Sequence, residues 1–496
     1  MTSSGTTSGD GGTTGAADGT ADAAGAVGGP AWELLLPAAG APARRRGRAL
    51  QAALRDAVRS GRLAAGTRLP SSRALATDLG VSRGLVTEAY EQLTAEGYLR
   101  SDRGSGTWVG EAARAGLPGA PGPAPRISST RVHFHPGQPD LALFPRSAWI
   151  AAYRTVLGDM PHRALGYPDP RGLPALRTAL AKLLTRRRGV VADPDCLVVC
   201  SGVTQATTLL GLVAHGHGER SIGVEDPGSP VHGPVFTASG LGMTALPLDD
   251  EGLAMEPLRR SGVRTVMVTP AHQFPTGIAY SARRRVELLD WARSVDGLVV
   301  EDDYDGDFRY DRAPVGALQG LDPERVAYTG SLSKSLAPGL RMGWLLVPPR
   351  LLDEIAERKR TIDLGEPSLD QSVLARFVER GDYDRHLRRC QRAYRERRDA
   401  LVAALAEHFP GTEVSGIAAG LHVIARLPEQ YGPEDGFLAR AARAGVAVRP
   451  LAQHEMTPTP QQSVRLVLGY AHLTPAEIAR GVALLAGATT PAGGAG

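Results

Sequence analysis

Short runs of β-branched residues alternate with longer segments of helical periodicity from about Arg131 onward. The runs read CLVVC, TVMVT, GLVVE and RVAYT in chain order. Alternating buried strands and helices are typical of a mostly parallel sheet whose faces are covered by helices. A chain of 496 residues is long enough for two or three structural units. We therefore assign the largest unit, an α/β domain with a mostly parallel sheet, to residues 131–485.

Low-complexity segments divide the rest of the chain. Residues 1–30 are rich in Gly, Thr, Ala and Ser, and they bury too little apolar surface to offset the entropy of ordering. Residues 111–130 are rich in Pro and Gly, as expected for an extended linker. We predict a disordered arm over 1–30, a compact unit over 31–110, a linker over 111–130 and a frayed tail over 486–496.

Positive charge is concentrated in the unit before the linker. Residues 44–109 contain twelve arginines, no lysine and six acidic residues, which gives +6, whereas the whole chain carries +4. Such local asymmetry is expected where phosphates are neutralised, although a solvated basic face has the same composition.

Two properties of the sequence exclude other classes of protein. No stretch of about 18 uncharged apolar residues could span a membrane, and the N-terminal residues lack the basic start and apolar run of a signal peptide. The three cysteines, Cys196, Cys200 and Cys390, provide neither a disulfide framework nor zinc-ligand spacing. We therefore predict a cytoplasmic protein without membrane contact and without a metal site.

The basic unit has the periodicity of three short helices. Leu50, Leu54 and Val58 share one helical face, and Gly66 and Pro70 then end that segment. Serines precede two further helical stretches as N-caps, and GYLRSDRGSGTWV reads as two strands about a Gly-rich tip. Three helices followed by such a wing form a winged helix-turn-helix. The candidate DNA-contacting residues are Ser71, Arg73, Ser82, Arg83, Arg103, Gly104, Ser105 and Thr107.

The segment LPSSRALATDLGVSRGLVTEAYEQLTAEGYLRSDRGSGTWV resembles the DNA-binding domain of the GntR family over its whole length. By this resemblance the partner is double-stranded operator DNA, contacted by Arg73, Arg83 and the wing residues 104–106. One departure is the entry helix, where three consecutive arginines, residues 44–46, replace the usual apolar and aromatic residues. Pattern, wing and local charge together favour DNA binding over three core helices with solvated arginines.

The sequence SLSKSLAPGLRMG, residues 331–343, follows the strand-like run VAYTG. The amine of a lysine forms a Schiff base with an aldehyde cofactor when a loop at the edge of a sheet holds it above the ring. Lys334 has that position. Arg341, together with Ser331 and Ser333, can bind a phosphate dianion through charge-assisted hydrogen bonds. Because most lysines in Ser-rich loops are merely exposed, this interpretation depends on the segments that precede it.

Two earlier segments supply the other contacts that such a cofactor needs. In CSGVTQATTLLG a strand leads into a helix, whose first amides near Val203 and Thr204 form an anion site suited to phosphate. In GLVVEDDYDGDF a buried strand ends at Asp302, where a carboxylate can pair with a protonated pyridine nitrogen. Tyr304 can donate its hydroxyl to the ring oxygen.

Alternatives remain for two neighbouring segments. The acids of GLVVEDDYDGDF are also typical of a calcium loop, but an EF-hand starting at Asp303 requires glycine where this chain has Phe308. In TPAHQFPTG a strand end and a turn place His272 or Gln273 against the cofactor ring, whereas the alternative is an ordinary turn. We expect His272 to contact the cofactor.

Together these segments resemble fold-type I enzymes that use pyridoxal phosphate, and specifically the aminotransferase-like domain of MocR regulators, over the whole α/β unit. By this resemblance Lys334 forms the Schiff base and Asp302 pairs with the pyridinium nitrogen. Arg341 and Thr204 belong to the phosphate cup. In VRLVLGY, Arg465 then holds an effector α-carboxylate, unless it only forms a surface ion pair. The resemblance also implies a head-to-tail homodimer.

The chain departs from this family where a ring-stacking aromatic residue is common. In EDPGSPVHGP that position is Ser229, an arginine sometimes found two places later is Val231, and His232 is the candidate substitute for stacking. Phe274 stands where true aminotransferases have an asparagine, a change that MocR relatives share. These departures favour a sensor of the cofactor over a catalyst.

The leading hypothesis is a transcription regulator that responds to pyridoxal phosphate, alone or with an amino-acid or amine effector. Control of vitamin B6 metabolism is the role that the resemblance suggests. A working aminotransferase with an added DNA-binding domain is the alternative, and Lys334 does not discriminate because both require it. A scaffold that binds DNA but no cofactor is a third hypothesis.

Overall fold

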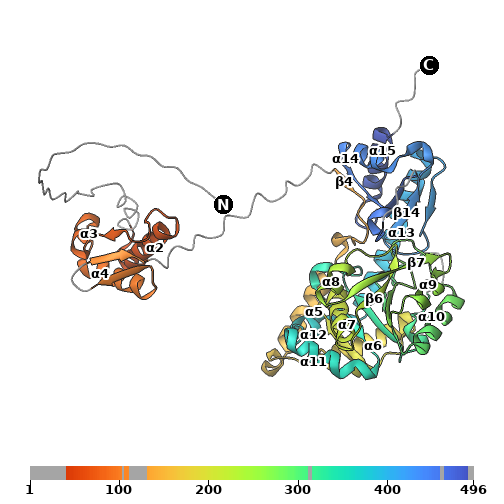
Figure 1. Cartoon of the computed structure of the whole chain (residues 1–496), viewed down its shortest axis with the longest axis horizontal. Coiled ribbons are helices and arrows are strands. Elements are labelled where there is room, and N and C mark those ends of the chain that lie inside the picture. Colours follow the sequence, from red (N-terminus) through yellow and green to blue (C-terminus); the bar gives the residue numbers. More distant parts are fainter. Residues whose placement is uncertain (1–40, 103–105, 111–130, 311–314, 458–462, 490–496) are drawn as a thin grey trace, which may run out of the picture. The chain divides into compact units, whose positions relative to one another are not determined.

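The computed structural model describes residues 41–102, 106–110, 131–310, 315–457 and 463–489. The chain forms two compact units, Met1–Arg126 and Ile127–Gly496 (Figure 1). The predicted arm over 1–30, the predicted linker over 111–130 and the predicted DNA contacts Arg103, Gly104 and Ser105 lie outside the described residues.

The described part of the N-terminal unit contains helices and a small antiparallel sheet (Figure 1). Its elements are η2 (Ala43–Arg45, a 3-10 helix), α2 (Arg46–Arg59), β1 (Arg68–Leu69), α3 (Ser72–Leu79), α4 (Arg83–Ala95), β2 (Leu99–Asp102) and β3 (Gly106–Val109). The strand order is β1-β3-β2, and β2 pairs with β3 as the two strands of the wing. Leu54, Leu75, Val86 and Leu93 are fully buried in its core. The predicted winged helix-turn-helix is confirmed.

The local sequence determines where these helices begin and end. Ser71 Oγ accepts a hydrogen bond of 3.1 Å from the Ala74 amide. Ser82 Oγ accepts one of 3.4 Å from the Leu85 amide. Each serine therefore caps the helix that follows it. α3 ends at Gly80, whose φ of 63° lies in the left-handed region that favours glycine.

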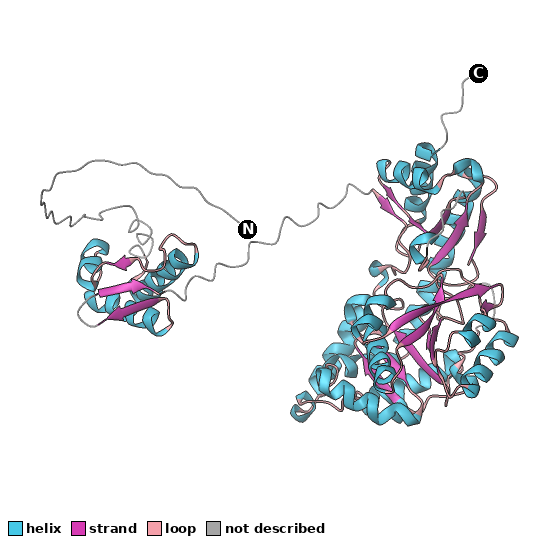
Figure 2. Cartoon of the chain, viewed as in Figure 1, coloured by secondary structure: helices cyan, strands magenta, loops and turns pink. Residues whose placement is uncertain are grey.

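An eight-stranded sheet, ordered β5-β12-β11-β10-β9-β6-β7-β8, forms the centre of the C-terminal unit (Figure 2). Its strands are β5 (Leu197–Cys200), β6 (Ser221–Asp226), β7 (Gly242–Asp249), β8 (Gly252–Leu253), β9 (Thr265–Val268), β10 (Leu298–Asp302), β11 (Val326–Ser331) and β12 (Gly343–Leu346). Neighbouring strands are parallel from β11 to β7, whereas β12 is antiparallel to β5 and β11 and β8 is antiparallel to β7. β5, β9, β10 and β11 coincide with the four β-branched runs, so the predicted mostly parallel sheet is confirmed.

Helices cover both faces of this sheet (Figure 2). Val300 and Ala327 pack in one core cluster with α7 and α11, whereas Val299 and Val326 pack in another with α9 and α10. The helices around the sheet are α5 (Arg146–Asp159), α6 (Pro174–Arg188), α7 (Val203–Gly216), α8 (His232–Ala238), α9 (Met255–Arg260), α10 (Ala282–Ser294), α11 (Leu352–Asp363) and α12 (Ser368–Glu379). In the part of the chain that the structure describes, no helix is long and apolar enough to cross a membrane.

A second, smaller sheet forms the carboxyl-terminal part of the unit, in the order β13-β14-β17-β16. Its elements are α13 (Asp382–His408), β13 (Glu413–Ser415), β14 (His422–Arg426), α14 (Glu434–Arg443), β15 (Val446–Ala447), β16 (Arg449–Pro450), η11 (Leu451–His454), β17 (Arg465–Gly469) and α15 (Pro475–Thr489). β4 (Val132–His133) pairs in parallel with β15. The first described residues of this unit are thereby joined to its last quarter.

The last helix, α15, continues beyond the residue at which the sequence predicts its end. A frayed tail was predicted from Ala486, but α15 continues to Thr489. Leu485 is only 1% exposed and Ala486 packs against the core, so burial extends the helix by about one turn. The prediction of a tail over 486–496 is corrected for residues 486–489.

Candidate cofactor site and DNA-binding surface

A cavity of about 560 Å³ opens at the carboxyl ends of the parallel strands. Eight of the residues predicted to bind the cofactor line it: Val203, Thr204, Asp302, Tyr304, Ser331, Ser333, Lys334 and Arg341. They come from distant segments, and they meet because parallel strands end at one edge of the sheet. Ligand pockets of about 300 to 1,000 Å³ are typical of proteins, so the cavity is large enough for a pyridine ring with a phosphate.

The amine of Lys334 lies in this cavity, in the loop after β11. Its Nζ donates a hydrogen bond of 2.5 Å to the carbonyl oxygen of Gly137. Gly137 has a φ of 76°, and a Cβ there would lie 3.0 Å from Nζ, so glycine permits this close approach. Burial lowers the pKa of the amine, while the charges of Asp302 and Asp305 oppose this shift. A less basic amine is more often unprotonated near neutral pH, which is the form that attacks an aldehyde.

Asp302 ends β10 and is 8% exposed. Its Oδ1 accepts a hydrogen bond of 3.2 Å from Thr329 Oγ1. Its Oδ2 lies 4.0 Å from Nε2 of His232. Burial lowers the pKa of His232 to about 4, so its imidazole is neutral at neutral pH. Burial raises the pKa of Asp302 to about 7, because the charged form has lost its water. A carboxyl group in this state fits a protonated ring nitrogen, which would supply a compensating positive charge.

Replacing Asp302 by asparagine in the cofactor-free protein is expected to change how stability depends on pH. The Asp302 pKa rises from 3.8 to about 7 on folding, so folding takes up a proton between these values. The stability that Asp302 contributes is complete below pH 3.8 and is lost as the pH rises to about 7. The free energy of unfolding falls by at most about 1.4 kcal/mol for each pH unit in this range. As the pH rises from 3.8 to about 7, the free energy of unfolding of the asparagine variant should therefore increase relative to that of wild type. Above a pH of about 7, the difference between the two proteins should stay constant.

Denaturant unfolding of both proteins across this pH range measures the difference. A difference that does not vary with pH would show that the buried Asp302 carboxyl keeps its ordinary pKa.

A further group of lining residues is suited to an anion. Gly202, at a φ of 110°, precedes α7, and the first amides of that helix have no acceptor within the helix. The guanidinium of Arg341 lies beside Gly202, because a Cβ added to Gly202 would be 3.5 Å from Nη1 of Arg341. Ser331 Oγ accepts a hydrogen bond of 3.3 Å from the Ser333 amide, at the same end of β11. A phosphate dianion would satisfy the helix amides and the guanidinium together, so these residues fit the phosphate group.

Tyr304 lines the cavity, and His272 stands behind it. His272 Nδ1 lies 2.9 Å from Tyr304 Oη and 2.9 Å from Asp305 Oδ2. Burial raises the pKa of Tyr304, so its hydroxyl stays protonated and can donate a hydrogen bond. The sequence predicts that His272 contacts the cofactor. Among the residues that the structure describes, His272 does not line the cavity, and it instead contacts Tyr304, which does.

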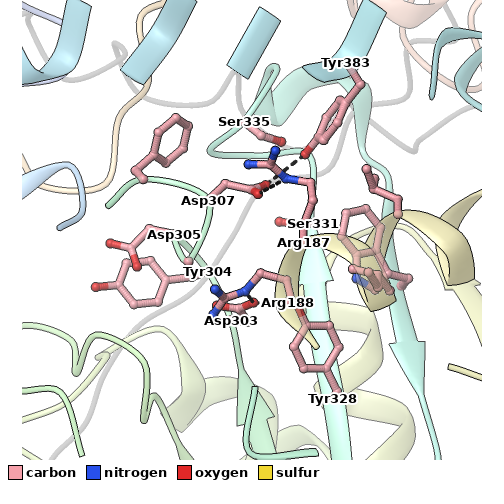
Figure 3. Close-up of a pocket in the computed structure, with 15 residues that line it drawn as sticks. Arg187, Arg188, Asp303, Tyr304, Asp305, Asp307, Tyr328, Ser331, Ser335 and Tyr383 are labelled. Atoms are coloured by element: carbon pink, nitrogen blue, oxygen red, sulfur yellow. Dashed lines mark hydrogen bonds and ion pairs between the residues drawn. The ribbon is translucent and has the colours of Figure 1, made fainter. Parts of the chain in front are cut away.

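The acids that follow Asp302 each contact a basic residue. The pairs are Asp303 with Arg188, Asp307 with Arg187 and Asp305 with His272, at 2.6, 2.8 and 2.9 Å. Figure 3 shows these acids and both arginines around a cavity of about 20 Å³, where Tyr328 Oη also donates to Asp303 at 2.5 Å. In the described ranges, no group of three or more His, Cys, Asp or Glu side chains is arranged to hold a metal ion. These three contacts fix the loop that directly follows Asp302.

Sequence reasoning missed several segments that line the cavity, among them residues 135–138 and 453–456. The first follows β4 and the second overlaps the end of η11. Neither segment carries a glycine-rich loop or an acid at a strand end, which are the signals that identified the other residues. They reach the cavity through tertiary contacts, such as the pairing of β4 with β15.

Arg465 has a different environment from the one expected of an effector-binding residue. It is not among the described residues that line the cavity, whereas Ser229, Val231 and His232 are. Its Nη2 forms an ion pair of 2.8 Å with Oε1 of Glu455, which does line the cavity.

Exposed arginines lie on the helices and the wing of the N-terminal unit. Arg83 is exposed at the start of α4 and Arg73 is exposed in α3, and neither helix has an acid in its first turn. Arg68 and Arg100 lie on either side of the Trp108 ring, each 5.9 Å from its centroid. Of the other predicted contacts, Ser71 and Ser82 are exposed helix caps, and Thr107 Oγ1 lies 3.1 Å from Ser101 Oγ in the wing. Such a surface suits the phosphates of a DNA backbone.

Two family models match the chain, one in each unit. The model of bacterial regulatory proteins of the gntR family matches residues 47–109, and that of aminotransferase class I and II matches residues 137–485. The aminotransferase family depends on pyridoxal phosphate.

Three relatives that span more than 80% of the chain are named as regulators. The uncharacterized HTH-type transcriptional regulator YhdI of Bacillus subtilis is 34% identical over 88% of this chain and 93% of its own length. The probable rhizopine catabolism regulatory protein MocR of Rhizobium meliloti is 34% identical over 88% and 92%. The HTH-type pyridoxine biosynthesis transcriptional regulator PdxR of Corynebacterium glutamicum is 32% identical over 81% and 87%.

Solved structures similar to the chain are aminotransferases. An archaeal alanine:glyoxylate aminotransferase has a TM-score of 0.65 and 27% identity, covering 72% of this chain and 90% of that one. The multiple substrate aminotransferase of Thermococcus profundus has a TM-score of 0.65 and 29% identity, covering 73% and 92%. The fold-type I architecture predicted from the sequence is confirmed.

Proposed function

The chain belongs to the MocR-type transcription regulators of the GntR family, and on this premise we propose that pyridoxal phosphate bound around Lys334 changes how it occupies operator DNA. The observation that carries this proposal is the hydrogen bond from Lys334 Nζ to the Gly137 carbonyl. It joins the amine that we expect to react with the cofactor to the segment that follows the predicted linker.

That segment, residues 131–140, is anchored at both ends. Its anchors are hydrogen bonds from the Arg131 amide to Gly445 O and from the Phe134 amide to Ala447 O, and an ion pair between Asp140 and Arg397, at 2.7, 2.8 and 2.6 Å. Between the anchors, residues 135–138 line the cavity. A change at Lys334 therefore acts on a short, held segment whose amino end leads along the chain to the DNA-binding unit.

The residues of the cavity have complementary roles in this proposal. When bound, pyridoxal phosphate supplies an aldehyde and an electron-withdrawing ring. Arg341 and the first amides of α7, with Val203, Thr204, Ser331 and Ser333 around them, bind its phosphate. Asp302 pairs with the ring nitrogen, and Tyr304, oriented by His272, donates to the ring oxygen. Lys334 would provide the amine for the cofactor's aldehyde.

Coupling between the two sites is reciprocal, and this provides the test. If the cofactor changes operator affinity by some factor, operator DNA must change cofactor affinity by the same factor, typically about 5 to 150-fold. Operator affinity is measured by fluorescence anisotropy with and without pyridoxal phosphate, and cofactor affinity by absorbance with and without operator. Equal factors that differ from one, in either direction, support the proposal, whereas two affinities that do not influence each other would refute it.

A head-to-tail homodimer is part of the proposal, because a dimer can occupy two operator half-sites. Apolar side chains that the described unit leaves exposed support it: Ile150, Leu157, Leu165 and Tyr167 are 48%, 54%, 60% and 89% exposed. Exposed apolar side chains that gather in one patch mark interfaces between proteins, and these four come from a single stretch of the chain, residues 150–167. Light scattering of the full-length protein tests this element, and a monomer at the concentrations used for DNA binding would contradict it.

We place the action of the protein in the cytoplasm, where operator DNA lies, and its target in vitamin B6 metabolism. The name of the Corynebacterium relative, a pyridoxine biosynthesis regulator, supports this target. Deletion of the gene should change the transcript levels of pyridoxine-synthesis genes in a way that depends on pyridoxal supply. Unchanged transcripts would remove vitamin B6 metabolism from the proposal.

Replacing Arg83 by alanine is expected to cost about 1 to 3 kcal/mol of operator discrimination and to leave cofactor binding unchanged. Arg83 is exposed at the amino end of α4, where a recognition helix contacts base edges. Arg62 is exposed in the same unit and is bonded to Ser60, so Arg62→Ala is the matched control. Anisotropy with operator and with scrambled DNA gives the discrimination. An Arg83 variant that still discriminates like wild type would show that α4 does not read the bases.

A further inference from the structure

Glu455 stands between the cavity and Arg465. Its side chain lines the cavity, and its Oε1 lies 2.8 Å from Nη2 of Arg465. The side chains of Glu455 and Arg465 are 15% and 24% exposed, so water screens the pair only partly. The guanidinium that was expected to bind an effector carboxylate already holds a carboxylate of the chain itself.

The backbone on both sides of Glu455 is fixed to the loop that carries Ser229. The Gly228 amide donates a hydrogen bond of 2.8 Å to the His454 carbonyl. The Met456 amide donates one of 3.0 Å to an oxygen of the Asp226 side chain. The backbone of Glu455 is therefore held in place before any ligand arrives, so pairing with the arginine restricts only the side chain.

A carboxylate held in the same chain has a large advantage over a dissolved one. Groups joined by a short linker reach effective concentrations of about millimolar or more. A ligand carboxylate would also leave Glu455 unpaired in a partly shielded position, and would approach its like charge. Displacing Glu455 from Arg465 therefore costs a dissolved carboxylate part of its binding free energy.

We propose that Glu455 determines ligand specificity: by occupying Arg465 it excludes ligands that carry a carboxylate and leaves the site to pyridoxal phosphate or to amines without a carboxylate. This inference rests on the proposed function and narrows its class of effector. Arg449 is exposed at the cavity, where its Nη1 lies 3.3 Å from Gln453 Oε1. It is a second route by which a carboxylate could bind, and the test includes it.

The test compares L-alanine with ethylamine, its counterpart without the carboxylate. Each is titrated into the full-length, cofactor-loaded protein, and both the cofactor absorbance and operator affinity are measured. Wild type should bind L-alanine no more tightly than ethylamine. Glu455→Gln frees the Arg465 guanidinium, so its affinity for L-alanine should rise about tenfold or more while its affinity for ethylamine is unchanged.

Two control variants assign any gain to Arg465. Glu429→Gln removes the same charge from an exposed glutamate and should behave as wild type. The double variant Glu455→Gln/Arg465→Met should lose the gain. The proposal would be overturned if wild type bound L-alanine tenfold more tightly than ethylamine, through Arg449 or otherwise. It would also be overturned if Glu455→Gln had the same ratio of affinities for L-alanine and ethylamine as wild type.

A second arm separates this inference from the proposed function. In the cofactor-free protein, maleate should raise the Tm of Glu455→Gln more than that of wild type, because the variant adds the Arg465 guanidinium to the cations that both proteins offer, Arg341 and Arg449. If wild type takes up no pyridoxal phosphate, the proposed function fails and this arm still decides the role of Glu455. If maleate raises both Tm values equally, the inference fails even where cofactor binding stands.

Discussion

Replacing Lys334 by alanine is expected to abolish the absorbance band of bound pyridoxal phosphate and the response of operator binding to the cofactor. The physical reason is that Lys334 supplies the amine in the cavity, where its Nζ is hydrogen-bonded to Gly137 and influenced by the charges of Asp302 and Asp305. DNA binding without the cofactor should remain, because every predicted DNA contact lies in the other unit of the chain.

Absorbance spectra, borohydride reduction followed by peptide mapping, and anisotropy titrations measure these effects. Lys182 is exposed on α6, outside the described cavity wall, so Lys182→Ala is the matched control and should behave as wild type. A Lys334 variant whose operator affinity still responds fully to pyridoxal phosphate would show that the cofactor acts at another site.

Replacing Arg188 by methionine is expected to destabilise the C-terminal unit by about 3 to 5 kcal/mol, the cost of leaving a buried charge without its partner. Arg188 and Asp303 form an ion pair of 2.6 Å in which both side chains are 4% exposed (Figure 3). A Cβ on Gly306 would lie 2.0 Å from an oxygen of Asp303, so the loop closes tightly over the pair. Methionine retains most of the volume of arginine, so the loss reports the charge more than a cavity.

Chemical denaturation of the cofactor-free protein measures this loss. Arg186 lies on the same helix, is 59% exposed and pairs with Asp384, so Arg186→Met is the control and should cost less than about 1 kcal/mol. Equal losses in the two variants would mean that the buried pair contributes no more than a surface one. Loss of cofactor binding in Arg188→Met under folding conditions would further show that the loop positions Asp302.

Residues at the ends of regular elements could be predicted from sequence because their environment is local. Asp302 closes the segment LVVED, whose apolar run predicts a buried strand, and its position at the strand end follows from that prediction. Ser82 precedes an amphipathic segment, and its hydroxyl caps the helix by accepting a hydrogen bond from the Leu85 amide, three residues later. In both cases the chain neighbours alone determine the chemistry.

Other features of the site depend on contacts between segments that are far apart in sequence. Gly137 and Lys334 are 197 positions apart, and the local sequence does not predict that β4, which leads to Gly137, pairs with β15. Family resemblance identified Arg465 as a candidate carboxylate ligand, but it could not reveal that Glu455 reaches the same guanidinium. His272 was expected at the ring, and its actual partners, Tyr304 and Asp305, lie on a different strand end.

The central claim is that one chain joins cofactor binding to operator binding, and a protection footprint on the DNA upstream of the gene tests it most directly. The footprint is recorded with wild-type protein in the presence and absence of pyridoxal phosphate, and again with Lys334→Ala. We expect the cofactor to change the extent or the affinity of protection with wild type and to have no effect with the variant. A wild-type footprint that is the same at all cofactor concentrations, from protein shown by absorbance to hold the cofactor, would contradict the account.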